Sequence, residues 1–197
     1  MNFFKKLFKT STNALSSKEE TVNNPSDVFS LDDLFVQNFI NKGGKFLYCI
    51  SQKEALATFH NILKENNWTK ISCVDSQLKD ICNLTKSPIS TSNYDSPFFT
   101  NCEHLVADSG NIMLSSNQIR EMKLGELDQN FIVFAKTSQM VKNMGEALTG
   151  IKINSKGKLP TNICDIRNYS DQQTKENFLN YGVSNTKNLY LILVEDL

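Results

Sequence analysis

The sequence predicts an α/β fold, a three-layer Rossmann-like arrangement in which helices cover a mostly parallel sheet. Three observations support this prediction. Short apolar runs alternate with amphipathic helical patterns in the first half of the chain, as βαβ units require. The final apolar run, residues 188–194, is too continuous for an edge strand that faces water. The 197 residues, 40% of them hydrophobic, suffice for one domain with a sizeable core.

Each element is expected from a local pattern. Ser30 and Asp33 resemble a capping box at the start of a helix, and Gly43-Gly44 would close this helix because glycine accepts the left-handed cap conformation. Strands are then expected at Lys45–Ile50, Ile71–Val74, Leu105–Ala107, Ile112–Leu114, Phe131–Ala135 and Asn188–Val194. Further helices are expected at Gln52–Glu65, Gln77–Leu84, Thr137–Leu148 and Asp171–Asn180, with loops at Thr85–Asn101 and Lys152–Pro160.

The chain is expected to have two parts. Residues 1–29 are an N-terminal basic and aromatic segment followed by a flexible linker, and residues 30–197 form the α/β domain. Within residues 1–9, Phe4, Leu7 and Phe8 share one helical face with lysines between them, which suits weak peripheral contact with an anionic membrane. A mobile tail or a partner-docking helix explains the same residues. The segment lacks the apolar core and cleavage site of a secretory signal.

Composition and cysteine spacing exclude several classes of function. Lys and Arg together number 21, as do Asp and Glu, so no basic field favours nucleic acid as a partner. The five cysteines form no C-x-x-C pair, and their odd number without a secretory signal predicts reduced thiols in the cytoplasm. The sequence contains neither a dinucleotide fingerprint nor a P-loop. We therefore expect no metal and no cofactor.

The turn Asp108-Ser109-Gly110-Asn111, between two apolar runs, is the first candidate site. All four residue types favour turns, so an ordinary hairpin explains them. Alternatively, Asp108 lies at a strand end with its carboxylate in a cleft, and nearby amides hold an anion. Arg120 is the second candidate, because a guanidinium binds a carboxylate or a phosphate through paired hydrogen bonds. A surface ion pair explains Arg120 equally well.

Three motifs resemble the LUD domain family, in its LutC-like branch of lactate-utilisation proteins. That family reads A-E-T-G-T before an apolar run, later A-D-I, and finally G-V-H-G-P before the last strand. Here those places read Ala107-Asp108-Ser109-Gly110-Asn111, Cys164-Asp165-Ile166 and Gly182-Val183-Ser184-Asn185-Thr186. The resemblance implies a fold of the NagB/RpiA/CoA-transferase-like type. In some relatives a glutamate at the first motif performs covalent or acid–base chemistry, and Asp108 is one methylene shorter.

The resemblance also implies a set of site residues. Asp108 is the catalytic candidate, and the expected ligand-binding residues are Ser109, Gly110, Asn111, Arg120, Thr161, Asn162, Asp165, Ser184 and Asn185. Ser184 stands where the family has the histidine of its last motif. The chain's two histidines, His60 and His104, lie elsewhere, so no Ser-His-Asp or Cys-His arrangement can be assembled from spacing.

By resemblance, the chain is expected to be a non-redox subunit that supports the oxidation of L-lactate to pyruvate. Its expected partners are iron–sulfur lactate-oxidation subunits, and its expected ligand is a small carboxylate or phosphate. The chain itself has no cluster ligands, so it would not carry electrons. Two alternatives remain open: a stand-alone CoA-transferase-like or phosphosugar enzyme that uses Asp108, and an interaction module whose site is vestigial.

Overall fold

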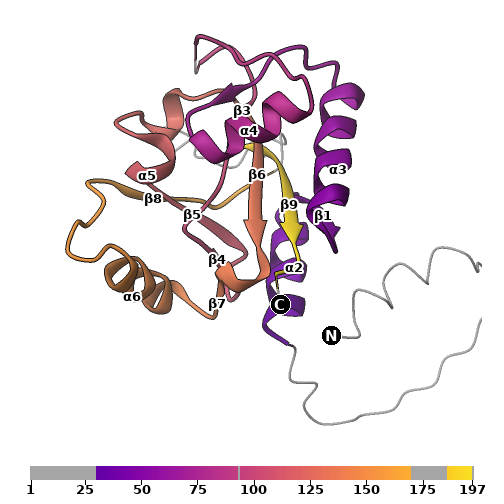
Figure 1. Ribbon diagram of the computed structural model, residues 1–197. Coiled ribbons are helices and arrows are strands. Elements are labelled where there is room, and N and C mark those ends of the chain that lie inside the picture. Colours follow the sequence, from indigo (N-terminus) through magenta and orange to yellow (C-terminus); the bar gives the residue numbers. More distant parts are fainter. Residues whose placement is uncertain (1–29, 93, 170–185, 197) are drawn as a thin grey trace, which may run out of the picture.

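The computed structural model describes residues 30–92, 94–169 and 186–196, and a five-stranded parallel sheet lies at its centre (Figure 1). The strand order is β1-β9-β6-β3-β2. The last strand in the chain, β9, pairs in parallel with both β1 and β6, as its continuous apolar sequence predicts. The strands are β1 (Lys45–Cys49), β2 (Ser72–Cys73), β3 (Phe98–Thr100), β6 (Asn130–Lys136) and β9 (Asn188–Val194).

Two helices, α3 (Gln52–Glu65) and α4 (Ser76–Leu84), cover one face of this sheet (Figure 1). A side chain caps each of them, because the Ser51 hydroxyl accepts from the Glu54 amide and the Asp75 carboxylate accepts from the Leu78 amide. Their buried stripes pack against every second residue of the strands, since successive side chains on a strand face opposite sides. The resulting core includes Phe59, Leu78, Ile81, Phe99, Ile132 and Ile192.

The other face of the parallel sheet carries helix α2 (Leu31–Asn41) and a second, four-stranded sheet of order β7-β4-β5-β8. Helix α6 (Met144–Asn154) covers the far side of the second sheet through Ala147 and Ile151. The strands of this sheet are β4 (His104–Val106), β5 (Asn111–Ser115), β7 (Met140–Val141) and β8 (Ile163–Ile166). Short turns complete the described chain, namely α5 (Ser116–Ile119), η2 (Leu124–Glu126) and η3 (Thr137–Gln139).

The predicted three-layer α/β fold is confirmed, and two of its expected elements are wrong. The expected loop Thr85–Asn101 contains β3, whose three residues are all buried. The expected helix Thr137–Leu148 does not form: η3 and β7 occupy its first half, and β7 pairs with β4. The helix begins instead at Met144, where the Asn143 side chain accepts from the Glu146 amide, and it continues to Asn154, into the expected loop Lys152–Pro160.

Some predictions concern residues outside the described ranges. These are the N-terminal segment and linker, residues 1–29, and the helix expected at 171–180, so the domain boundary at residue 30 stays a prediction. None of the helices in the described ranges combines the length and the apolar character needed to cross a bilayer. All five cysteines are free thiols.

Candidate functional site

The turn with Asp108 joins two antiparallel strands, β4 and β5, so the hairpin interpretation is confirmed. The turn packs on α2, where the Asn38 amide donates to the carbonyl oxygens of Ala107 and Asp108. Gly110 has a φ of 64°, and a Cβ there would lie 2.6 Å from the backbone nitrogen of Phe39, so only glycine fits. The Asp108 side chain itself is exposed.

Four side chains beside this turn form a polar network that we call the hairpin cluster: Lys42, Asn111, Asp165 and Arg167. The Lys42 ammonium donates to the Asn111 side-chain oxygen at 2.9 Å and to the Ser109 carbonyl. The Asn111 amide donates to Asp165 at 2.9 Å, and the Arg167 Nε donates to both Asp165 oxygens at 2.9 Å. Burial lowers the pKa of Lys42, and the Asp165 carboxylate opposes this effect.

The hairpin cluster has the character of a structural clamp. It joins α2, β5 and β8, three elements that are distant in sequence. The polar groups of Asn111 and Asp165 are buried and satisfy one another, as buried polar groups must if the fold is to be stable.

The two histidines are not part of a shared site. His104 is buried beneath α6, where a Cβ on Gly150 would lie 2.6 Å from its Nε2 atom. His60 lies exposed on α3. His104 is therefore a buried packing residue.

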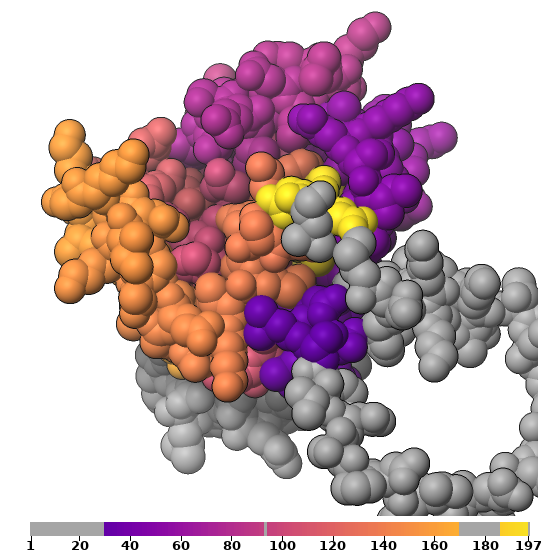
Figure 2. Space-filling view, turned by 60° about the horizontal axis from the view of Figure 1, so that its bottom comes forward, coloured from indigo at the N-terminus to yellow at the C-terminus, as the bar shows by residue number. Residues whose placement is uncertain are grey.

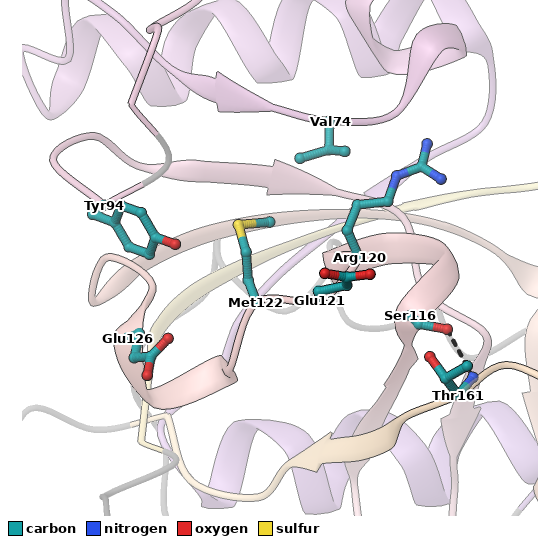
Figure 3. A pocket seen from close by; sticks show the side chains of 8 residues that line it. All are labelled: Val74, Tyr94, Ser116, Arg120, Glu121, Met122, Glu126 and Thr161. Atoms are coloured by element: carbon teal, nitrogen blue, oxygen red, sulfur yellow. Dashed lines mark hydrogen bonds between the residues drawn. The ribbon is translucent and has the colours of Figure 1, made fainter.

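A hollow of about 620 Å³ lies at the other end of β5, and we call it the Arg120 hollow. Figure 3 shows the Arg120 side chain rising to the level of Val74, with its guanidinium turned away from Tyr94 and Glu126 and with Ser116 and Thr161 on the guanidinium's side of the hollow. The residues that line it are Val74, Tyr94, Ser116, Arg120, Glu121, Met122, Glu126 and Thr161. Its lining therefore combines a cation, hydroxyl groups, two carboxylates and apolar surface.

The capping of α5 determines where Arg120 lies. The Ser115 hydroxyl accepts from the Asn117 amide while the Gln118 side chain accepts from the Ser115 amide, and Glu103 accepts from both Ser115 and Asn117. Arg120 ends this turn with φ 56° and ψ −130°. A residue with a Cβ adopts such a conformation only at a cost of roughly 1–3 kcal/mol.

The segment before β8 closes one side of the hollow. The Thr161 amide donates to the Ser116 hydroxyl at 3.0 Å, and the Ser116 amide donates to the Asn162 carbonyl at 2.9 Å. Thr161 thus lines the hollow, whereas Asn162 supports it through its backbone. Opposite them, Val74 directly follows β2, so the hollow adjoins the carboxyl end of a parallel strand, where α/β proteins commonly bind ligands.

The structure divides the expected site residues into two groups. Asp108, Ser109, Gly110, Asn111 and Asp165 lie at the hairpin end of β5, while Arg120, Thr161 and Asn162 lie at the other end. From Asn111 to Ser116 the strand spans about 16 Å at about 3.3 Å per residue. The structure therefore does not bring Asp108 and Arg120 together. Ser184 and Asn185 lie outside the described residues.

Several residues of the two groups were missed from the sequence. Lys42 and Arg167 complete the hairpin cluster, and Tyr94, Glu121 and Met122 line the Arg120 hollow. Arg167 had one local signal, because it shares a strand face with Asp165 two residues earlier. The others come from separate elements and had no local signal. Within the described residues, no group of three or more His, Cys, Asp or Glu side chains is placed to hold a metal ion.

Two comparisons relate the chain to known proteins. The crystal structure of a DUF162 family protein from Deinococcus radiodurans has a similar fold, with a TM-score of 0.59 and 12% sequence identity over 83% of this chain and 96% of that chain. No curated protein gives a match to the sequence. The model of the LUD domain matches residues 96–194, half of the chain, from just before β3 to the end of β9. The chain therefore belongs to the LUD domain family.

Proposed function

We propose that this LUD domain is a cytoplasmic, non-redox subunit that supports the oxidation of L-lactate to pyruvate beside iron–sulfur partner proteins. In this proposal the Arg120 hollow binds a small 2-hydroxy acid anion. The link of the LUD domain family to lactate utilisation supports the reaction, and the balanced charge of the chain agrees with a small-molecule ligand rather than nucleic acid.

The conformation of Arg120 is the observation that carries the ligand assignment. Its backbone is strained, its side chain lines the hollow, and within the described residues its guanidinium has no hydrogen bond or ion pair. Strained residues persist where the surrounding structure enforces them, and they gather at ligand-binding sites. A free guanidinium in a hollow is a ready partner for a carboxylate.

The remaining lining suits a hydroxy acid better than a simple carboxylate. A 2-hydroxy acid needs a cation for its carboxylate and an acceptor for its hydroxyl group. Arg120 supplies the first, and the neighbouring Glu121 carboxylate or the Ser116 and Thr161 hydroxyls supply the second. The other carboxylate, Glu126, is already paired with Lys123 at 3.4 Å. Among the residues that the structure describes, no contact of Asp108 favours the alternative in which it acts as a covalent carboxylate.

The test is calorimetric titration of the full chain with lactate, pyruvate and propionate, which lacks the hydroxyl group. Lactate should bind more tightly than propionate, and Arg120→Gln should weaken lactate binding about 10- to 100-fold, as expected for a lost charge-assisted hydrogen bond. Arg167→Gln is the matched control, because it removes the chain's other arginine from the far end of β5.

Equal lactate binding by wild type and Arg120→Gln would overturn the ligand assignment. The partner assignment has its own readout: a tagged full chain from its native cell should co-purify cysteine-rich iron–sulfur proteins. If the chain binds lactate but no such proteins co-purify, the ligand assignment is retained and the partner assignment is overturned. Full cellular function in Arg120→Gln would instead identify the hollow as vestigial.

A further inference from the structure

One stretch of the surface is both basic and aliphatic. Between Glu146 and Asp165 the sequence contains no acidic residue. We call six exposed residues in this stretch the α6 surface: Leu148, Lys152, Ile153, Lys156, Lys158 and Leu159. Leu148 is 45% exposed, Ile153 70% and Leu159 60%. Figure 2 shows α6 and the residues after it, in orange, at the left margin of the molecule.

The fold itself does not account for this surface. Helix α6 uses Ala147 and Ile151 to pack on Val106 and Met113 of the second sheet, so its other faces are not needed there. A lysine in the last turn of a helix stabilises the helix dipole, which explains Lys152. That effect explains neither the exposed Ile153 nor the two lysines that flank Gly157. The combination therefore indicates a partner.

Charge complementarity and residue type decide what kind of partner fits. Three exposed lysines in a stretch of sequence that contains no acidic residue favour an anionic surface. Protein interfaces are enriched in Trp, Tyr and Arg and depleted in Lys, and the α6 surface has the opposite composition. Lysines beside exposed aliphatic residues are typical of segments that lie on anionic lipid. None of the six residues lines the Arg120 hollow, so the surface is separate from the proposed ligand site.

We infer that the α6 surface docks on an anionic membrane, with its lysines against lipid phosphates and Leu148, Ile153 and Leu159 at the acyl boundary. Binding through one such patch is weak, and stable attachment usually takes two signals. The sequence offers a second basic and apolar segment in residues 1–9. The inference does not depend on the proposed function, because it uses other residues.

Co-sedimentation of the full chain with vesicles tests the inference. Vesicles of phosphatidylcholine alone should leave the protein in the supernatant, whereas vesicles that also contain phosphatidylserine should pellet it at low salt. Added salt should release it, because salt screens exposed charges. The variant K152E/K156E/K158E should partition about 100-fold less, from a contribution of about 1 kcal/mol per lysine.

The control carries the same charge change elsewhere. K64E/K70E/K86E alters three exposed lysines near the ends of α3 and α4 and should bind like wild type. Both triple variants are compared with wild type by circular dichroism, so that a folding defect is recognised. Ile153→Ser with Leu159→Ser should weaken binding at low salt as well, because it removes two of the apolar side chains from the acyl boundary.

Two results would overturn the inference. If wild type stays in the supernatant with both kinds of vesicle, the lipid partner is excluded. The lysines of the α6 surface would then fit an acidic protein instead. If the two triple variants lose binding equally, the attraction comes from overall charge and not from the α6 surface.

Discussion

The side-chain amide of Asn111 donates a 2.9 Å hydrogen bond to the carboxylate of Asp165, and this bond joins two of the family-like motifs across neighbouring strands. Arg167 and Lys42 extend the contact to a network of two cations and one buried carboxylate. The network lies one strand length away from Arg120, so motif residues in this family member contribute to stability as well as to the candidate site.

Asp165→Ala should lower the free energy of unfolding by about 1–3 kcal/mol, because the Asn111 amide and the Arg167 guanidinium lose their buried acceptor. Urea denaturation measures this loss, and calorimetric titration with lactate should give an unchanged affinity. Asp95→Ala, at an exposed position, is the control and should change little. A stable variant that no longer binds lactate would move Asp165 into the ligand site.

Gly110→Ala should be far more destabilising than Gly157→Ala. Both glycines have a positive φ, 64° and 87°, so both substitutions strain the backbone by about 1 kcal/mol. At Gly110 the new Cβ would also meet the α2 backbone at 2.6 Å, whereas at Gly157 nothing lies within 4 Å. Thermal unfolding of the two variants separates the strain from the clash. Similar melting temperatures would show that the hairpin can shift away from α2.

Arg120→Gly should be more stable than Arg120→Ala, although neither can bind the carboxylate. Alanine keeps the strain of φ 56° and ψ −130°, whereas glycine adopts this conformation freely, and the difference should be about 1 kcal/mol. Urea denaturation of both variants gives the comparison. If the alanine variant is the more stable, the backbone at position 120 relaxes once the guanidinium is removed, and strain is no argument for function.

Lys187 predicts a pH dependence of stability. Its ammonium is buried against the carbonyls of Leu127 and Asp128, and burial lowers its pKa from 10.5 to about 8 in the folded protein. Between these two values the unfolded chain binds one more proton than the folded chain. The contribution of Lys187 to the free energy of unfolding therefore rises with pH in this interval, by up to roughly 1.4 kcal/mol per pH unit.

Denaturation of wild type and Lys187→Met on both sides of pH 8 checks this prediction. The methionine variant should lack the part of the rise that belongs to Lys187, since it has no proton to release. Lys64→Met, at an exposed lysine in the last turn of α3, should follow wild type. Parallel pH profiles for Lys187→Met and wild type would show that Lys187 is solvated enough to keep an ordinary pKa.

Elements with a strong local signal were predictable from the sequence. The apolar stripe predicted α3 with its observed bounds, and the continuous apolar run predicted β9. The misses depend on tertiary contacts. Strand β3 is only three residues long, follows Pro97 and forms because Phe98 and Phe99 are buried on opposite faces of the sheet. Strand β7 exists because β4 offers it a partner.

Individual candidate residues could be predicted from the sequence, but which of them lie together in the structure could not. The turn chemistry of Asp108 to Asn111 and the anion-binding potential of Arg120 could both be inferred locally. Strand β5 lies between the turn and Arg120 in the sequence. Because the strand is extended, the two lie at its opposite ends. The backbone strain at Arg120 could not be predicted from a single sequence.

The position of β9 has a consequence for how the protein is made. Its neighbours β1 and β6 precede it in the chain, so during synthesis on the ribosome both wait with unpaired edges until the final strand emerges. Pairing between such distant segments is intrinsically slow, and open apolar edges invite association with other nascent chains. The parallel sheet can therefore close only after β9 has emerged, and until then we expect the growing chain to need protection by chaperones.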